Sequence, residues 1–281
     1  MRMVSLWTVG LLGAAFLLVG ASSTLAQTTA VPGDVLVAGP PQYLTIGFGT
    51  TPLPVRVFSA TGVLKTQFGH AVIVSTRQSR ILLSDGYQLR ANDLSLTELW
   101  NVMVPDGIAV IALDDAGRSF VTQSNGTRHA SVYEYDSSGN LRTSFPLTDG
   151  WAFHCFGCPE SGDVAPDNCV LWFVDGFFRA RRYDTCRGTL LGDPAPGQTF
   201  NDVRALSGGG FIGTQGRFLR VYDASGILVR SIVSATEGNI SSFAFSEDAR
   251  SVWVIGFGQN EIRKLNLVDG STLASIPLAG C

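Results

Sequence analysis

Six polar residues could form a ligand site, because each lies just before an apolar segment of the chain. They are Asp34, His70, Asp106, Asn201, Asp202 and Asn239. Carboxylate and amide oxygens are the ligands that calcium prefers, at about 2.3–2.6 Å. If these residues converge, they could hold Ca²⁺ or another divalent cation, and a water polarised by the metal could then carry out hydrolysis. The alternative interpretation is that these polar residues only cap turns.

The cysteines suggest a second kind of chemistry. Four of the five lie close together in the sequence, as Cys155, Cys158, Cys169 and Cys186. Their spacing resembles a zinc site, but the second pair is not a Cys-x2-Cys knuckle and an exported chain favours disulfides. Four cysteines allow three connectivities, and the spacing alone leaves them open. Cys281 is left over, and it could pair between chains or stay free.

Other catalytic arrangements are poorly supported by the sequence. The histidines His70, His129 and His154 are scattered, and the chain has no Gly-x-Ser-x-Gly elbow for a serine hydrolase. A redox role for Cys155 and Cys158 would need a helix N-terminus, and no helix is predicted. The aromatic residues around Trp172 fit core packing, whereas Phe177 and Phe178 at a predicted hairpin tip would mark a binding edge.

The N-terminus predicts export. Arg2 precedes an apolar run from Val4 to Ala21, and the small residues Thr24 and Ala26 suit cleavage before Gln27. The rival interpretation is an uncleaved anchor, because a run of about 18 residues is near the minimum for a membrane span. We expect a signal peptide at residues 1–26 and a secreted or periplasmic mature chain, residues 27–281, without a membrane span.

Composition limits the fold and the partners. The chain has 281 residues, of which 45% are hydrophobic and 15% charged, so it can bury a large core in one domain. The net charge is −3, which offers no basic excess for a phosphate backbone. We therefore do not expect nucleic acid as a partner. We expect an unknown protein or a small ligand instead.

Internal repeats supply the elements that must position these residues. Residues 200–232 read as four short strands with tight turns, and such a meander needs neighbours of its own kind to bury its faces. Six turns align, each followed by a strand with a leucine: Leu64, Leu99, Leu141, Leu190, Leu228 and Leu273. Spacings of 35, 42, 49, 38 and 45 residues predict an all-β chain, a six-bladed β-propeller of four-stranded antiparallel blades.

The repeat register assigns the strands. The units are 33–68, 69–103, 106–148, 149–196, 198–235 and 238–278. The predicted inner strands are Asp34–Ala38, Ala71–Ser75, Ile108–Leu113, Trp151–Phe156, Val203–Leu206 and Ile240–Phe245. The predicted second strands are Tyr43–Phe48, Arg80–Ser84, Ser119–Gln123, Val170–Asp175, Phe211–Thr214 and Val252–Phe257. This register brings the six polar residues, with Asp149 or Trp151, to one end of the channel. Because the first unit reads as complete, face packing plus a strand at Gln27–Val31 is one way to close the ring, and the sequence leaves the mode of closure open.

The Asp-x-x-Gly turns, such as Tyr222-Asp-Ala-Ser-Gly226, resemble those of the NHL-type and YVTN-type propellers. The segments Asp167–Val174 and Arg181–Cys186 resemble exported bacterial propellers of no assigned activity, and this resemblance implies a Cys169–Cys186 disulfide, which would leave Cys155 to Cys158. The polar residues at the channel are also similar to those of gluconolactonase-type propellers, which hold a divalent metal. Phe200-Asn-Asp202 resembles one phrase of that family, but no Glu precedes any predicted inner strand here.

We therefore expect an exported propeller that acts as a binding or scaffold module, with a ligand or protein at the channel mouth. The alternative is a divalent-metal-dependent hydrolase of the gluconolactonase type. Propellers host many functions on one scaffold, so the repeats predict the fold and leave the ligand open.

Overall fold

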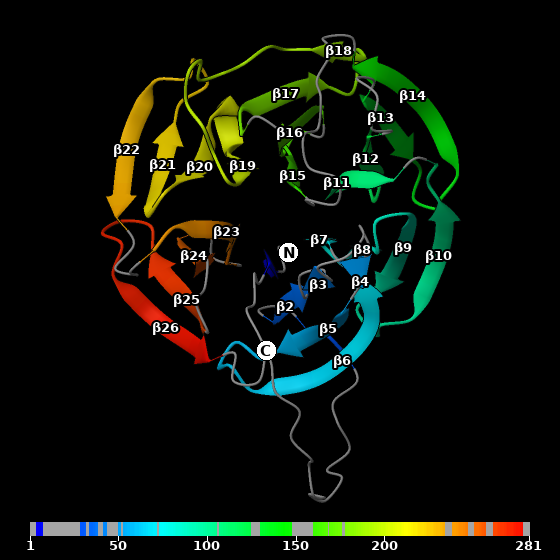
Figure 1. The fold of residues 1–281 in the computed structure, drawn as a ribbon, viewed down its shortest axis with the longest axis horizontal. Helices are drawn as coiled ribbons and strands as arrows, with labels where there is room; N and C mark the ends of the chain where they lie inside the picture. The colour runs from blue at the N-terminus through cyan, green and yellow to red at the C-terminus, as the bar shows by residue number, and fades with distance from the viewer. Residues whose placement is uncertain are drawn as a thin grey trace, which may run out of the picture.

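The computed structural model describes residues 4–7, 29–31, 34–38, 42–43, 50–51, 53–71, 73–105, 107–124, 130–147, 160–167, 169–175, 178–233, 238–246, 250–256 and 261–277. Their strands form six four-stranded blades arranged in a ring, which confirms the predicted six-bladed β-propeller (Figure 1). A separate two-stranded ribbon pairs β3 (Gln42–Tyr43) with β4 (Thr50–Thr51).

The blades follow one another along the chain, each listed from its inner to its outer strand. Blade 1 is β1 (Val4–Trp7), β2 (Val35–Ala38), β5 (Leu53–Phe58) and β6 (Leu64–Ala71); blade 2 is β7 (Ile73–Arg77), β8 (Arg80–Ser84), β9 (Gln88–Asp93) and β10 (Glu98–Met103). Blade 3 is β11 (Ile108–Leu113), β12 (Ser119–Ser124), β13 (Ala130–Tyr135) and β14 (Leu141–Leu147); blade 4 is β15 (Glu160–Val164), β16 (Val170–Val174), β17 (Ala180–Asp184) and β18 (Thr189–Leu190). Blade 5 is β19 (Val203–Ala205), β20 (Phe211–Gln215), β21 (Phe218–Tyr222) and β22 (Leu228–Val233); blade 6 is β23 (Ile240–Phe245), β24 (Ser251–Gly256), β25 (Glu261–Asn266) and β26 (Thr272–Pro277).

Strand pairs within the blades are antiparallel, with one exception. β1 runs parallel to β2, and Val4 pairs with Val35. A second parallel pair, between β11 and β15, joins the inner edges of blades 3 and 4. The inner strands of these two blades therefore run in the same direction along the channel.

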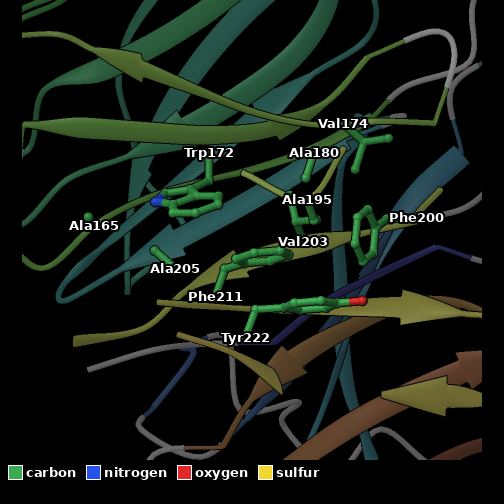
Figure 2. Close-up of a cluster of buried hydrophobic side chains, with 10 residues drawn as sticks. All are labelled: Ala165, Trp172, Val174, Ala180, Ala195, Phe200, Val203, Ala205, Phe211 and Tyr222. Carbon is green, nitrogen blue, oxygen red and sulfur yellow. The ribbon is translucent and has the colours of Figure 1, made fainter. Parts of the chain in front are cut away.

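The core consists of six clusters of buried hydrophobic side chains, and each cluster lies between two neighbouring blades. Figure 2 shows the cluster between blades 4 and 5. There the Trp172 ring stacks on Phe211 at a centroid distance of 4.9 Å, and Phe211 stacks on Tyr222 at 4.6 Å. Phe200 packs edge-on against both Phe211 and Tyr222. Apolar faces that no single blade could bury are thus covered by the next blade.

The ring closes where blade 1 meets blade 6, a contact that we call the seam. Val35, Val37 and Phe58 of blade 1 pack against a blade 6 surface that includes Trp253 and Ile276. No strand pair joins these two blades in the described part of the chain, and the contact among these residues is packing of the two blade faces. The predicted strand at Gln27–Val31 is not seen: Thr29–Val31 form no strand, and residues 27 and 28 lie outside the described ranges.

The turns between the third and fourth strands have the predicted conformation. Gly226, for example, has φ 81°, and Asp223 accepts hydrogen bonds from the backbone N–H groups of Ser225 and Ile227. The equivalent residue of blade 2 is Leu96, which also has a positive φ, 67°. Gly226 also allows a close contact between neighbouring parts of the ring. A Cβ at this position would overlap the carbonyl oxygen of Pro194, which follows blade 4 in the chain.

Three strand predictions were wrong. The segment Asp34–Ala38 does not form an inner strand: β2 is the second strand of blade 1, and its partner is β5 rather than the predicted Tyr43–Phe48. In blade 4 the inner strand is β15 instead of Trp151–Phe156, a segment outside the described residues. β15 has the sequence Glu-Ser-Gly-Asp-Val, which lacks the apolar run expected of an inner strand. Its glycine, Gly162, lies directly against Val110, so close packing takes the place of a large apolar side chain.

Candidate functional site

The two ends of the channel differ, and we name them by the inner strands. The mouth is the end where β11, β19 and β23 begin, and the base is the end where they finish. Because blades 2 to 6, and the outer three strands of blade 1, are antiparallel meanders, the turns between second and third strands also lie at the mouth. The turns between first and second strands, and between third and fourth strands, lie at the base.

Asp202 lies at the start of β19, but its carboxylate is fully occupied. It accepts hydrogen bonds from the Arg204 guanidinium at 2.5 Å, from the Ser242 hydroxyl at 2.7 Å and from the Phe243 backbone N–H at 3.0 Å. Burial raises the pKa of Asp202, while Arg204 and the hydrogen bonds favour the charged form. The residue therefore ties blade 5 to blade 6.

Two amide residues lie beside it at the mouth. The Asn201 side chain donates to the Ile240 carbonyl oxygen at 2.8 Å, so it also links blade 5 to blade 6. Asn239 is exposed at the start of β23. The structure thus brings Asn201, Asp202 and the entrance of blade 6 together.

The other residues of the sequence-predicted site lie elsewhere. Asp34 precedes β2, which starts at the base, and its carboxylate is 2.6 Å from the Lys65 ammonium group in a buried ion pair. His70 is exposed on the outer strand β6, where its carbonyl oxygen accepts a hydrogen bond from Arg90 at 2.5 Å. Asp106, Asp149 and Trp151 fall outside the described residues.

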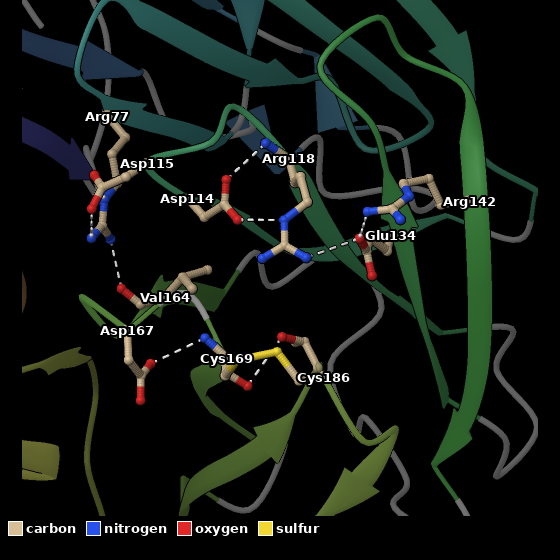
Figure 3. A network of polar contacts seen from close by, with 11 residues as sticks. Arg77, Asp114, Asp115, Arg118, Glu134, Arg142, Val164, Asp167, Cys169 and Cys186 are labelled. Carbon is tan, nitrogen blue, oxygen red and sulfur yellow. Dashed lines mark hydrogen bonds and ion pairs between the residues drawn. A yellow bond between two sulfur atoms is a disulfide. The ribbon is translucent and has the colours of Figure 1, made fainter.

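A network at the base, which the sequence did not suggest, connects four blades. Figure 3 shows its members Arg77, Asp115 and Val164, from blades 2, 3 and 4. Arg77 of blade 2 binds both carboxylate oxygens of Asp115 in blade 3, at 2.6 and 3.1 Å. It also donates to the Val164 carbonyl oxygen of blade 4 at 2.6 Å and lies 3.4 Å from Asp163. Asp163 in turn accepts the Ala205 N–H of blade 5 at 3.0 Å. The only feature of the sequence that could have pointed to this network is an arginine at the end of an inner strand.

Arg77 is buried yet charged. Burial opposes its charge, but the hydrogen bond to Asp115 and the charge of Asp163 leave the pKa of Arg77 raised. A guanidinium with several acceptors has a fixed planar geometry, so this residue holds blades 2, 3 and 4 at defined positions. The base is therefore a cross-linked, rigid end of the ring.

The structure contains the disulfide Cys169–Cys186, with a Cα–Cα distance of 5.2 Å (Figure 3). It links the turn before β16 to the turn after β17, within blade 4. Asp167 accepts the Cys169 N–H at 3.0 Å and orders the first of these turns. Cys155, Cys158 and Cys281 lie outside the described residues. Within the described ranges, no group of three or more His, Cys, Asp or Glu side chains could hold a metal ion.

At the mouth, blades 4 and 5 carry aromatic and arginine side chains that are exposed or partly exposed. Phe178, at the turn between β16 and β17, is 55% exposed with φ 61°, while its neighbour Phe177 is not described. On blade 5, the guanidinium groups of Arg217 and Arg220 lie 5.8 and 5.7 Å from the Phe218 ring centre. We call Phe178, Arg217, Phe218 and Arg220 the aromatic-basic strip.

The segment between blades 4 and 5 holds the two parts of the strip together. The Phe200 N–H donates to the Phe178 carbonyl oxygen at 2.6 Å. Gln198 accepts a side-chain hydrogen bond from Gln215 at 3.1 Å, and Gln215 pairs with Phe218 in the sheet. Aromatic rings and guanidinium groups bind planar or anionic groups by stacking and charge-assisted hydrogen bonds.

Comparison with known proteins identifies the fold but not the family. No protein-family model matches the chain, and no curated protein matches its sequence. A protein of unknown function from Bacteroides caccae aligns over 88% of this chain and 94% of its own, with a TM-score of 0.63 and 11% identity. Hydrazine synthase from Kuenenia stuttgartiensis aligns over 71% of this chain and 63% of its own, with a TM-score of 0.50 and 15% identity.

These identities support the fold alone. In total, 1396 chains of solved structures match, so the architecture is too common to indicate an activity. The resemblance to NHL-type and YVTN-type repeats stays a prediction. No helix among the described residues is long and apolar enough to cross a membrane.

Proposed function

We propose that the chain is an exported binding module, and that its ligand occupies the channel mouth at the aromatic-basic strip of blades 4 and 5. The observation that carries this proposal is the exposure of Phe178 beside a blade on which Arg217 and Arg220 flank Phe218. A large aromatic side chain at a turn tip contributes nothing to the core. Its exposure therefore favours an interaction role.

The chemistry of the strip favours a partner with acidic groups, either a protein segment or a small ligand. Arg217 forms no ion pair with any described residue, so its guanidinium can donate hydrogen bonds to an external carboxylate or phosphate. Asp202 is buried and its charge is paired with that of Arg204, so it does not repel such a ligand.

Export is supported by two observations. The apolar run after Arg2 ends in small residues, as signal peptides do. The Cys169–Cys186 disulfide suits an oxidising compartment. We therefore propose a secreted or periplasmic location after cleavage before Gln27.

The hydrolase alternative requires a metal at the mouth, and no observation on the described residues favours it. Two of its oxygen ligands would come from Asp202, which would have to leave Arg204, and from Asp34, which lies at the base with Lys65. Titration with Ca²⁺, Zn²⁺ and Mg²⁺ while Tm is measured provides the direct check, because a bound ion raises Tm.

The binding proposal can be tested with arrays of acidic peptides and acidic glycans probed with the exported protein. We expect Phe178→Asp to weaken binding about tenfold or more, since one stacked ring is worth about 1–3 kcal/mol. Asp also tolerates the positive φ of this position, so the fold is retained.

Val63→Asp is the matched control. Val63 is also highly exposed, at 64%, but it lies in a turn at the base. Equal binding by the wild type and both variants, or equal loss in both variants, would exclude the mouth as the binding site.

A further inference from the structure

The innermost strand of blade 1 differs from that of every other blade. In blades 2 to 6 the inner strand is antiparallel to the second strand and is joined to it by a short turn. In blade 1, β1 is parallel to β2 and comes from a distant part of the chain, residues 4–7. β1 is therefore added to the edge of a three-stranded sheet as a separate segment.

The site that receives β1 is built by the rest of the ring. β1 pairs along all of β2, from Val35 to Ala38, and also lies against β23, β24 and β7. The side chains of Val35, Leu36, Val37 and Ala38 are completely or almost completely buried. They pack into the interfaces with blades 6 and 2, so the position of β2 is fixed by its neighbours. We call the inner edge of β2, between β23 and β7, the strand seat.

The segment in the strand seat is the start of the expected signal peptide. Val4–Trp7 begins the apolar run that ends near Ala21. Cleavage before Gln27 would remove β1, and the backbone N–H and C=O groups of β2 that face it would lose their partners. Unpaired edge groups of this kind are a template for another strand.

We infer that the strand seat is a peptide-binding site of the mature protein, which Val4–Trp7 occupies only in the precursor. Its ligand is a short, extended, apolar peptide segment that adds to β2 as a parallel strand. This inference rests on the proposed export, and it places a second ligand inside the ring, apart from the aromatic-basic strip. Main-chain hydrogen bonds supply the affinity, and the neighbouring blades restrict the seat to about four residues.

The described walls of the seat show which chemistry fits. Val35, Val37 and Leu36 are apolar and buried among the side chains of blades 6 and 2, so a charged residue added beside them would be costly to desolvate. The sequence of β1, Val-Ser-Leu-Trp, contains no charged residue. The mature residues nearest to the seat do not fill it, because Val31 and Asp34 form a turn and the Ala30 N–H donates to the Leu94 carbonyl oxygen at 2.7 Å. Ala30 therefore lies against blade 2 rather than in the seat.

The test compares the full chain, produced without export, with the exported protein, whose first residue is determined by mass spectrometry. The probe is a fluorescent synthetic peptide with the sequence of residues 3–8 and a lysine tail. We expect saturable binding to the exported protein and at least tenfold weaker binding to the full chain, in which β1 occupies the seat. The same peptide with N-methyl groups on alternate amides should not bind, because it cannot pair with β2.

Three results would overturn the inference. The exported protein could retain residues 4–7, which would make β1 a permanent strand. The exported protein could bind neither the unmethylated nor the N-methylated peptide, or it could bind both peptides equally. The exported protein could also lack a cooperative unfolding transition when no peptide is added. In that case, a cooperative unfolding transition that returns with the unmethylated peptide would support the strand seat. If the transition does not return, the inference is refuted. Phe178→Asp should leave peptide binding unchanged, so failure at the mouth and failure at the seat can be distinguished.

Discussion

At the scale of single residues, the turn glycines have two separate functions. Gly226 and Gly192 have the same φ of 81°, but only Gly226 lies against another blade, where it faces the Pro194 backbone. Gly192 has no atom within 4 Å of the place where a Cβ would be. This pair therefore separates the conformational need for glycine from the need for close blade contact.

We expect Gly192→Ala to lower the free energy of unfolding by about 1–2 kcal/mol, the cost of a left-handed conformation for an L-residue. Gly226→Ala should cost about 1–3 kcal/mol more, because the extra methyl group must push the blades apart. Urea denaturation of both variants measures the difference. Equal losses would show that the blade contact at Gly226 has no energetic importance.

The buried ion pair between Lys65 and Asp34 has a different energetic character from surface pairs. The two side chains are 7% and 2% exposed, so removal of one charge leaves the other charge buried, with neither a partner nor solvent to stabilise it. We expect Lys65→Met to lower the free energy of unfolding by about 3–5 kcal/mol, and the double variant with Asp34→Asn to recover part of that loss.

Arg187→Met is the control for this experiment. Arg187 is 81% exposed and lies 3.8 Å from Asp184, so its loss should change stability by less than about 1 kcal/mol. An equally large effect of both substitutions would contradict the importance of burial at Lys65.

At the scale of elements, the turns between third and fourth strands couple stability to pH. Hydrogen bonds from backbone N–H groups and from Asn140 lower the pKa of Asp136, and those from Ser225 and Ile227 lower the pKa of Asp223. A carboxyl group with a lowered folded pKa stabilises the protein above its unfolded pKa. That contribution is lost as the pH falls through the lower folded pKa.

We therefore expect stability to fall as the pH drops below about 4, the ordinary pKa of Asp. The double variant Asp136→Asn/Asp223→Asn should lose less stability over the same range, because Asn keeps the turn oxygen but does not titrate. Tm measured from pH 7 to pH 2 gives the comparison. Parallel curves for the wild type and the variant would show that other groups dominate acid unfolding.

The elements also show how far sequence reasoning reaches. Ile108–Leu113, Arg80–Ser84 and Ile240–Phe245 were predicted with their observed bounds, because their apolar or β-rich runs end at clear turn residues. β15 was missed because packing at Gly162 and Asp163, rather than hydrophobicity, determines it. The first blade was shifted because its inner strand comes from residues 4–7, far from the repeat.

The candidate site was less predictable than the fold. The repeat register placed Asn201 and Asp202 before an inner strand, and in the structure they lie at the entrance of β19 and contact blade 6. It could not show that Arg204, two residues along the chain, neutralises Asp202. It also could not find the Arg77 network, because its members come from four blades and share no local pattern.

At the scale of the whole molecule, the seam is the one interface between blades that are not consecutive in the chain. Ile276 on β26 packs against Gly62 at the seam, and Ile232 on β22 occupies the equivalent place against Gly270, between blades 5 and 6. The two isoleucines have equivalent pairing positions in their sheets. They therefore form a matched pair for testing whether the seam opens first.

We expect Ile276→Ala and Ile232→Ala each to lower the free energy of unfolding by about 2–5 kcal/mol. Only Ile276→Ala should also speed amide hydrogen exchange selectively in β5, β6, β25 and β26, because it weakens the closure of the ring. Selective exchange at blades 5 and 6 in Ile232→Ala, or none in either variant, would mean that the seam is no weaker than the other interfaces.

The seam also determines the order in which the chain can finish folding. A chain that emerges from its N-terminus produces blade 1 first, and the apolar faces of Val35, Val37 and Phe58 then have no cover until blade 6 is complete. The Cys169–Cys186 bridge, in contrast, spans a sequence separation of 17 and can form as soon as blade 4 exists. Contacts between distant parts of a chain form slowly, and exposed apolar faces aggregate in the meantime. We therefore expect blade 1 to be the part of the nascent chain that depends most on a chaperone.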